Sequence, residues 1–295
     1  MRARQGSAAV VDLPVLERIA DLTAWAEDER RGGRVVGLVP TMGALHDGHA
    51  ALLRAAAASC DVVALTVFVN PLQFAPGEDL AAYPRTLDAD VAVAARAGAT
   101  VVFAPSVEEM FPVEVATTVH VAGLTEVLEG RARPAHFDGV ATVVAKLFAL
   151  VGACRAHFGE KDFQQLAVVR RMAKDLSFPV EVVGCPTVRA SDGLALSSRN
   201  AYLTPAERAA APVLLRALRA GASAVAAGER DPAAVVELVR SIIEAEPLAD
   251  VDAVDVVDAA TLRTPQLLEG DLRLLVAARF GRARLIDNVG MTADR

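Results

Sequence analysis

The chain has 295 residues, 53% of them hydrophobic and 23% charged, a composition that excludes a disordered chain and suffices for one large or two medium domains. Its net charge of −7 argues against a general nucleic-acid binder, which would carry a basic surface. Cys60, Cys154 and Cys185 are widely spaced, which predicts a reducing, cytoplasmic setting without structural disulfides or a zinc finger. Asp12 interrupts the N-terminal stretch before it reaches signal-peptide length, and we expect no membrane-spanning segment.

The first 185 residues alternate between apolar runs and helical patterns. Apolar residues at helical spacing from Leu16 to Trp25 predict a surface helix that ends near Gly32-Gly33. The runs at 34–39 and 61–69 predict two buried strands joined by a helix. A strand–helix–strand unit of this length is typical of a parallel sheet with right-handed crossovers. The further expected elements are a loop at 77–86, helices at 87–97, 140–151 and 160–174, strands at 100–103, 119–121 and 179–183, a strand ending at 155–159 and a polar loop at 129–139.

The order and composition of the expected elements change after residue 185. The expected elements are Ala-rich helices at 205–227 and 232–244, the first with Thr204 as N-cap, and strands at 251–257, 272–277 and 283–287. This pattern predicts a smaller α+β domain with antiparallel strands. The whole is therefore expected to be an α/β protein. A Rossmann-like, doubly wound parallel sheet forms the catalytic domain at 1–185, and the domain at 186–295 carries residues 197–200 and covers the active site.

Two histidines lie where the first buried strand meets a helix. At such a turn, phosphate groups meet free backbone N–H groups and the positive end of the helix dipole. His46 and His49 are three residues apart, so they lie side by side, and Gly43 and Gly48 allow a ligand to approach the backbone. A metal-binding pair is the alternative, but the loop offers only Asp47 as a further ligand. The turn therefore predicts phosphate binding.

Polar residues follow the second strand and open the next helix. Asn70 and Gln73 come directly after the strand, and in an open α/β sheet ligands bind beyond the carboxyl ends of the strands. We expect both to reach a polar substrate, although Asn70 followed by Pro71 also simply ends a strand. Asp88 and Asp90 suit the first turn of the helix at 87–97, and Mg²⁺ binding is the alternative role for Asp90.

Basic residues are scarce in this acidic chain, so their placement is informative. The loop at 129–139 holds two arginines and a histidine and is either an anion clamp or a solvated loop. Lys161 opens a helix, where a cation opposes the helix dipole, and this placement predicts an anionic ligand. Gln165 follows about one turn later and is expected to face the same way.

Five short blocks of the sequence resemble one enzyme family. They are residues 40–49 (PTMGALHDGH), 68–74 (FVNPLQF), 83–86 (YPRT), 158–165 (FGEKDFQQ) and 196–200 (LSSRN). In this order they resemble the pantothenate synthetases, or pantoate–β-alanine ligases, of the HxGH nucleotidyltransferase superfamily. HxGH alone fits any nucleotidyl-transfer enzyme of that superfamily, whereas the five blocks together are specific. The C-terminal part is similar more loosely, in its length and in its Asp287-Asn288 ending.

The resemblance implies a two-step reaction. The carboxylate of pantoate attacks the α-phosphorus of ATP, which gives a pantoyl adenylate and pyrophosphate. The amine of β-alanine then attacks the acyl carbon and releases AMP. Mg²⁺ would accompany the ATP, and, since the family is commonly dimeric, we expect a homodimer through the N-terminal domain, with no nucleic-acid or membrane partner.

The resemblance also implies roles for individual residues. Those expected to act on the phosphates in catalysis are His46, His49, Lys161, Ser197, Ser198 and Arg199, the last three closing over the leaving phosphates as in the related class I tRNA synthetases. Further ATP contacts would be Pro40, Thr41, Met42, Gly43, Phe158, Gly159, Asp162, Val188 and Leu196, with Asp162 on the ribose hydroxyls. Gln73 and Gln165 would bind pantoate through neutral amides, which leave its carboxylate nucleophilic. The other expected substrate contacts are Asn70, Tyr83, Arg133 and His136.

Three other functions are alternatives. A related nucleotidyltransferase with a phosphate-bearing substrate would need a cationic pocket where Gln73 and Gln165 are expected. A non-catalytic nucleotide-binding protein predicts lost histidines or a lost lysine, but His46, His49 and Lys161 are all present. The net charge of −7 weighs against a tRNA-binding relative of the synthetases.

Overall fold

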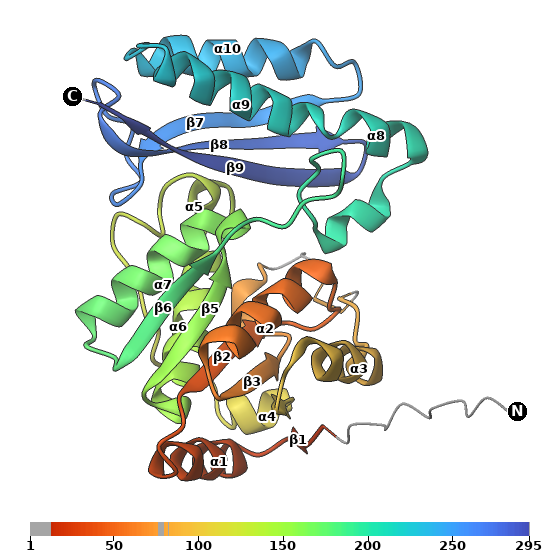
Figure 1. Cartoon of the computed structure of the whole chain (residues 1–295), viewed down its shortest axis with the longest axis vertical. Helices are drawn as coiled ribbons and strands as arrows, with labels where there is room; N and C mark the ends of the chain where they lie inside the picture. The colour runs from red at the N-terminus through yellow and green to blue at the C-terminus, as the bar shows by residue number, and fades with distance from the viewer. Residues whose placement is uncertain (1–12, 76–79, 82, 295) are drawn as a thin grey trace, which may run out of the picture.

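A computed structural model describes residues 13–75, 80–81 and 83–294, so the N-terminal stretch up to Asp12 and part of the predicted loop at 77–86 lie outside the described residues. The first domain is built on a six-stranded parallel sheet with the strand order β1-β4-β3-β2-β5-β6 (Figure 1). Its strands are β1 (Val15–Leu16), β2 (Val36–Thr41), β3 (Val62–Val67), β4 (Val101–Phe103), β5 (Cys154–Gly159) and β6 (Val180–Cys185).

Helices cover both faces of this sheet because its strands bury side chains on both sides. Leu38 of β2 lies in one apolar cluster with residues of α1, α6 and α7, and the next residue, Val39, lies in another cluster with residues of α2 and α3. The doubly wound fold class is therefore confirmed. The helices of this domain are α1 (Ile19–Arg31), α2 (Asp47–Ser59), α3 (Leu87–Ala97), α4 (Val107–Met110), α5 (Glu129–Ala132), α6 (His136–Val151) and α7 (Phe163–Asp175).

The strand order creates a crevice between β2 and β5. From β2 the chain adds β3 and β4 on one side, and it then crosses over to add β5 and β6 on the other. The connections that follow β2 and β5 therefore leave the carboxyl ends of these strands in opposite directions. Open α/β sheets bind ligands in the crevice that forms at such a point. The two histidines follow β2, and Lys161 follows β5.

The second domain is a three-stranded antiparallel sheet with helices packed on it. The strand order is β7-β8-β9, and α9 and α10 lie along the sheet (Figure 1). Its elements are the short helix η3 (Ser198–Tyr202), α8 (Pro205–Ala210), α9 (Val213–Ala226), α10 (Pro232–Glu244), β7 (Asp250–Asp258), β8 (Gly270–Phe280) and β9 (Ala283–Ala293). The predicted small α+β domain is thus confirmed. A domain boundary at 185/186 stays a prediction, and β6 ends at Cys185.

Several predicted boundaries in the first domain were wrong. Residues 119–121 form no strand, and the Val119 N–H instead donates to the hydroxyl of Thr142 on α6 at 2.9 Å. The helix expected at 140 already begins at His136, after Ala135 takes a left-handed φ of 68°. The helix expected at 160 begins as a 3₁₀ turn, η2 (Glu160–Asp162), before α7. Strand β1, only two residues long, carried no periodic signal and was missed.

The helix expected at 205–227 is divided into α8 and α9 because Pro212 has no N–H to continue a helix. By length and composition alone, Pro205–Ala226 could cross a membrane, which the sequence prediction did not anticipate. In the fold, however, Val213, Leu214 and Leu218 lie in the core of the second domain. We therefore interpret this segment as core helices.

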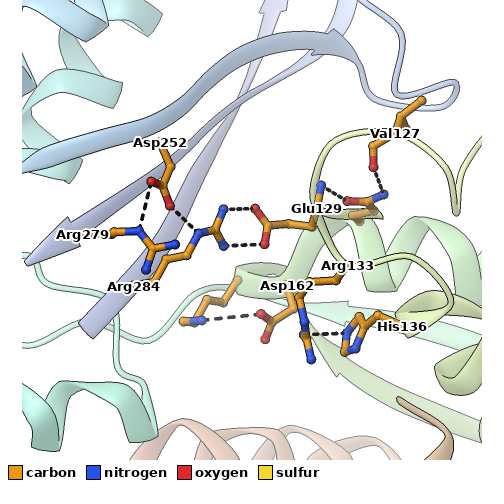
Figure 2. A network of polar contacts seen from close by, with 10 residues as sticks. Val127, Glu129, Arg133, His136, Asp162, Asp252, Arg279 and Arg284 are labelled. Carbon is orange, nitrogen blue, oxygen red and sulfur yellow. Dashed lines mark hydrogen bonds and ion pairs between the residues drawn. The ribbon is translucent and has the colours of Figure 1, made fainter. Parts of the chain in front are cut away.

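A network of ion pairs joins the two domains. Figure 2 shows Arg284 of β9 forming a two-pronged pair with Glu129 of α5, at 2.6 and 2.7 Å. The Nε of Arg284 also donates to Asp252 of β7 at 2.6 Å, and Arg279 donates to the same carboxylate at 3.2 Å. The hydrogen bonds to Glu129 raise the pKa of Arg284. Three-quarters of each side chain in the Arg284–Glu129 pair is covered, so solvent screens this pair less than a surface pair.

Removing the charge of Glu129 is expected to destabilise the folded protein measurably. The substitution Glu129→Gln keeps the size of the side chain but leaves a partly buried guanidinium without its carboxylate, and we expect the free energy of unfolding to fall by about 1–2 kcal/mol. Glu27→Gln is the matched control, since Glu27 pairs with Arg31 on an exposed helix face, and it should cost about 0.5 kcal/mol or less. Urea denaturation measures both. Equal losses would contradict the prediction.

Candidate active site

A cavity of about 180 Å³ lies at the carboxyl ends of β2, β3 and β5. Its polar lining comes from strand ends, loops and helix starts on both sides of the crevice. These residues are Thr41, His49, Thr66, Asn70, Gln73, Tyr83, Asp162 and Gln165. The sequence predicted all of them except Thr66 as site residues, and the cavity also includes the predicted Pro40, Met42 and Phe158.

Another part of the cavity lining is apolar, and the sequence reasoning did not identify most of it. Phe68 and Phe158 meet Val140, Val143, Val144 and Leu147 of α6 there. Helix α6 is apolar around almost its whole circumference, so its pattern indicated burial but not which face borders a ligand. The site can therefore receive a small molecule with one polar end and one branched apolar end.

The two histidines form the N-terminal cap of α2. The Nδ1 of His46 accepts a hydrogen bond from the Gly48 N–H at 3.1 Å, and the Nδ1 of His49 accepts one from the His46 N–H at 3.3 Å. The rings lie side by side, with centroids 4.2 Å apart. Because both Nδ1 atoms accept, each neutral imidazole carries its proton on Nε2. Both Nε2–H groups are thus assigned as donors for a ligand at the helix start.

The surroundings keep both imidazoles neutral. Burial lowers the pKa of His46, and the charge of Lys161 lowers it further, against a smaller opposing effect of Asp47. Burial, followed by the neighbouring His46, lowers the pKa of His49 from 6.5 to about 4. A neutral imidazole keeps the Nδ1 lone pair that the cap requires, so the cap and the pKa shifts favour the same protonation state.

Because the pKa of His49 is lowered in the folded protein, the free energy of unfolding should depend on pH. Between pH 6.5 and about 4, the unfolded chain binds a proton at this histidine that the folded chain does not bind. The free energy of unfolding should therefore fall as the pH drops through this window, and above pH 6.5 this contribution should be constant. In His49→Asn, which keeps a cap acceptor but does not titrate, urea denaturation between pH 7 and pH 4 should show a shallower fall. An unchanged slope would contradict the assignment.

Glycines in this turn are required by the loop itself, and their expected role in letting a ligand approach the backbone stays a prediction. Gly43 has φ +83°, and a Cβ there would lie 2.9 Å from Oδ2 of Asp90. A Cβ at Gly48 would lie 2.7 Å from the ring of His46. Larger residues at these positions would displace the side chains that shape the turn.

Asp90 of α3 holds the histidine loop from behind. Its side chain is only 2% exposed, and its two oxygens accept hydrogen bonds from the Ala44 N–H at 3.0 Å and the Leu45 N–H at 2.7 Å. The Thr86 hydroxyl, at the N-cap position of α3, makes no cap hydrogen bond and donates to both oxygens at 3.3 Å. This arrangement speaks against the Mg²⁺ role predicted for Asp90 and supports a structural one.

Asn70 orients Gln73. Its amide donates to Oε1 of Gln73 at 3.1 Å and to the carbonyl of Gly139 at 3.0 Å, and its Oδ1 caps the short helix η1 (Pro71–Gln73) at the Leu72 N–H. A Cβ at Gly139 would collide with the Leu72 carbonyl, so α6 and η1 pack backbone to backbone. Asn70 therefore both caps η1 and fixes the amide that borders the cavity.

The predicted basic loop contacts the other side of Gln73. The main-chain carbonyl of Gln73 accepts from Nδ1 of His136 at 2.9 Å and from Arg133 at 3.4 Å. Figure 2 shows that Arg133 also contacts His136, at Nε2 and 3.3 Å. Neither basic residue is among the described residues that line the larger cavity. Their contacts place them behind Gln73, and a direct substrate contact remains a prediction.

Lys161 and Asp162 lie in turn η2, between β5 and α7. The Lys161 side chain is 16% exposed, and its ammonium lies 3.5 Å from Oδ1 of Asp162. Burial raises the pKa of Asp162, but Lys161 and Arg199 outweigh that effect and hold the pKa below its usual value. Lys161 thus precedes the α-helix instead of opposing its dipole, and it lines a smaller cavity than Gln165 does.

Residues 196–200 form the other side of that smaller cavity. Ser197, Arg199 and Asn200 line it together with Lys161. The Ser197 hydroxyl caps η3 by accepting from the Arg199 N–H at 3.3 Å, and the Leu196 N–H donates to the Val188 carbonyl at 2.9 Å. Ser198 and Arg199 are exposed. The structure therefore brings Ser197 and Arg199 close to Lys161, outside the larger cavity.

The similarity to known proteins extends over nearly the whole chain. A family model described as pantoate-beta-alanine ligase matches residues 14–290. A pantothenate synthetase of Heliobacterium modesticaldum is 51% identical over 93% of this chain and 98% of its own length, and one of Dinoroseobacter shibae is 53% identical over 94% and 99%.

Solved structures agree with this result. A pantothenate synthetase structure from Thermus thermophilus has a TM-score of 0.88 at 50% identity, covering 94% of this chain and 99% of that one. A pantoate-beta-alanine ligase from Francisella tularensis, described as complexed with beta-gamma ATP and beta-alanine, has a TM-score of 0.75 at 29% identity and covers 94% and 97%. The chain therefore belongs to the pantoate-beta-alanine ligase family.

Proposed function

We propose that this protein condenses pantoate with β-alanine at the expense of ATP, giving pantothenate, AMP and pyrophosphate. The observation that carries the proposal is the two-sided cavity. Pantoate has a carboxylate and two hydroxyls at one side and a pair of methyl groups at the other. The amides of Gln73 and Gln165 line the same cavity as Val143 and its neighbours on α6, and this combination matches these two chemistries.

In the first step the pantoate carboxylate attacks the α-phosphorus of ATP. A P–O bond forms to the carboxylate, the bond between the α-phosphorus and the bridging oxygen breaks, and pyrophosphate leaves. Charge on the phosphate oxygens is stabilised by the Nε2–H groups of His46 and His49 and by Lys161. Neutral amides at Gln73 and Gln165 hold pantoate without quenching its carboxylate.

In the second step the amine of β-alanine attacks the acyl carbon of the adenylate. A C–N bond forms, the C–O bond to the phosphate breaks, AMP leaves, and the amine loses a proton. With a pKa of about 4, His49 is a poor base for that proton. We therefore assign the proton to solvent or to a phosphate oxygen.

Mg²⁺ belongs to the proposal as a companion of ATP. Within the described part of the chain, no group of three or more His, Cys, Asp or Glu residues fits a metal ion. Mg²⁺ commonly binds substrate phosphates and water with few protein ligands, which suits such a site.

We also propose a cytoplasmic homodimer that contacts through the first domain. All three cysteines are free thiols, which suits a reducing compartment. Sedimentation at micromolar concentration tests the assembly. A single species at the chain mass of 30.9 kDa would refute the dimer.

The activity is tested by leaving out each substrate in turn. AMP release from ATP and Mg²⁺ should require both pantoate and β-alanine, whereas exchange between ATP and labelled pyrophosphate should require pantoate alone. Exchange that proceeds with another acid but not with pantoate would favour a different nucleotidyltransferase. The absence of turnover with pantoate and any amine would make the substrate assignment wrong.

A further inference from the structure

The turn that carries Lys161 is held by a side chain of the other domain. Asn288, on β9, is 4% exposed. Its side-chain amide donates to two successive main-chain carbonyls of η2, that of Glu160 at 3.0 Å and that of Lys161 at 2.8 Å. Both donors of the amide are therefore used on the segment that presents the Lys161 ammonium.

The orientation of Asn288 is itself fixed. Its Oδ1 accepts from Arg273 of β8 at 3.1 Å, so the NH₂ group must point toward the two carbonyls. Its main-chain N–H donates to Asp287 at 2.8 Å, and Asp287 in turn accepts two hydrogen bonds from Arg189, at 2.6 and 2.9 Å. A buried network of this kind leaves the amide of Asn288 little freedom.

Arg273 contacts the same turn independently. Its guanidinium carbon lies 3.8 Å from the ring centroid of Phe163, the first residue of α7, and it pairs with Glu160 at 3.5 Å. The second domain thus contacts the chain on both sides of Lys161, at Glu160 in η2 and at the start of α7. The Lys161 side chain leaves this turn toward the smaller cavity, where Ser197 and Arg199 lie.

We propose that Asn288 is a positioning residue for Lys161: by binding the carbonyls of η2 it fixes where the ammonium meets the phosphates. The proposal rests on the phosphate role given to Lys161 above. A misplacement of about 1 Å can cost about a hundredfold in rate, so a distant side chain that fixes a backbone turn can matter for the chemical step. Asn288 is not among the described residues that line the larger cavity, where pantoate is proposed to bind. Substitutions of Asn288 should therefore change the affinity for pantoate little.

The test compares two substitutions of Asn288 with a control on the same strand. Asn288→Ala removes the donors. Asn288→Asp keeps the shape and the contact with Arg273 but turns an acceptor toward the carbonyls. Both should lower kcat for pantoate-dependent ATP–pyrophosphate exchange by about ten- to a hundredfold, with the KM for pantoate within about twofold. Thr292→Val, which loses only a hydrogen bond to Asp271 within its own sheet, should leave kcat unchanged.

A double-substitution cycle separates positioning from general weakening. If Asn288 acts through Lys161, adding Asn288→Ala to Lys161→Ala should cost little beyond Lys161→Ala alone. Equal losses in both backgrounds, or Asn288 variants as active as Thr292→Val, would overturn the proposal. Melting midpoints identify any variant that fails to fold, and the second Asn288 substitution then decides.

Failure of the underlying function gives a different result. If Lys161→Ala exchanges pyrophosphate at the normal rate, the phosphate role of Lys161 is wrong. If Lys161→Ala is inactive while both folded Asn288 variants keep normal kcat, only the positioning role is wrong.

Discussion

Lys161→Ala is expected to lower the rate of AMP formation by about a thousandfold or more, because removing a cation from a phosphoryl-transfer site removes stabilisation of the charge that builds up in the transition state. The KM for pantoate should change far less, since Gln73 and Gln165 hold that substrate in the proposal. The rate of Lys161→Arg should lie between those of the wild type and Lys161→Ala, because the charge is kept but a planar guanidinium replaces a point charge. Single-turnover formation of the adenylate measures the effect.

The matched control is Lys174→Ala. Lys174 lies in the last turn of α7, exposed to solvent, and its loss should leave the rate within about twofold of normal, as for most surface substitutions. If both lysine variants retained activity, Lys161 would have no part in the chemistry. If both lost activity equally, the effect would be one of overall charge.

The second large effect is expected at His49, and it should depend on which ring nitrogen is imitated. The substitution His49→Asn keeps an acceptor near the position of Nδ1, and so keeps the cap, but it lacks a donor at the position of Nε2. We expect this variant to lose about a hundred- to a thousandfold in adenylate formation. His49→Gln puts an NH₂ group near the position of Nε2 and should retain more of the rate.

The order of the two variants is the decisive result. If His49→Asn were more active than His49→Gln, the Nε2–H group would not be the phosphate donor, and the helix cap would be the main role of His49. His120→Asn serves as the control. His120 pairs with Asp138 and Glu126 on the exposed surface, outside both cavities, and its replacement should not alter the rate.

Local signals in the sequence predicted the parts of the site that lie close together along the chain. The histidine turn follows from an apolar strand that meets a helix start, and both signals lie within about twenty residues of each other. The same holds for Asn70 and Gln73 at the end of β3. The pattern also predicted the antiparallel strands and helices of the second domain, although it extended one helix through Pro212, whose missing N–H could have revealed the break.

Contacts between distant segments were beyond the reach of such signals. Nothing local to Asp90 indicates that its carboxylate binds Ala44 and Leu45, because those partners are defined only once α3 packs beside α2. In the same way, Asn288 meets the Lys161 turn only through the docking of one domain on the other. The side of α6 that borders the cavity could not be predicted, since the helix is apolar on nearly every side.

The capping role of His46 separates what keeps this protein folded from what makes it work. Ser, Thr, Asp and Asn are all better N-cap residues than most, so each could satisfy the start of α2 in place of His46. None of them has a counterpart of the Nε2–H group, which is the donor that His46 offers to a ligand. A library screened only for folding or expression would therefore accept such replacements freely, and thermal stability would be no guide to which of its members still make pantothenate.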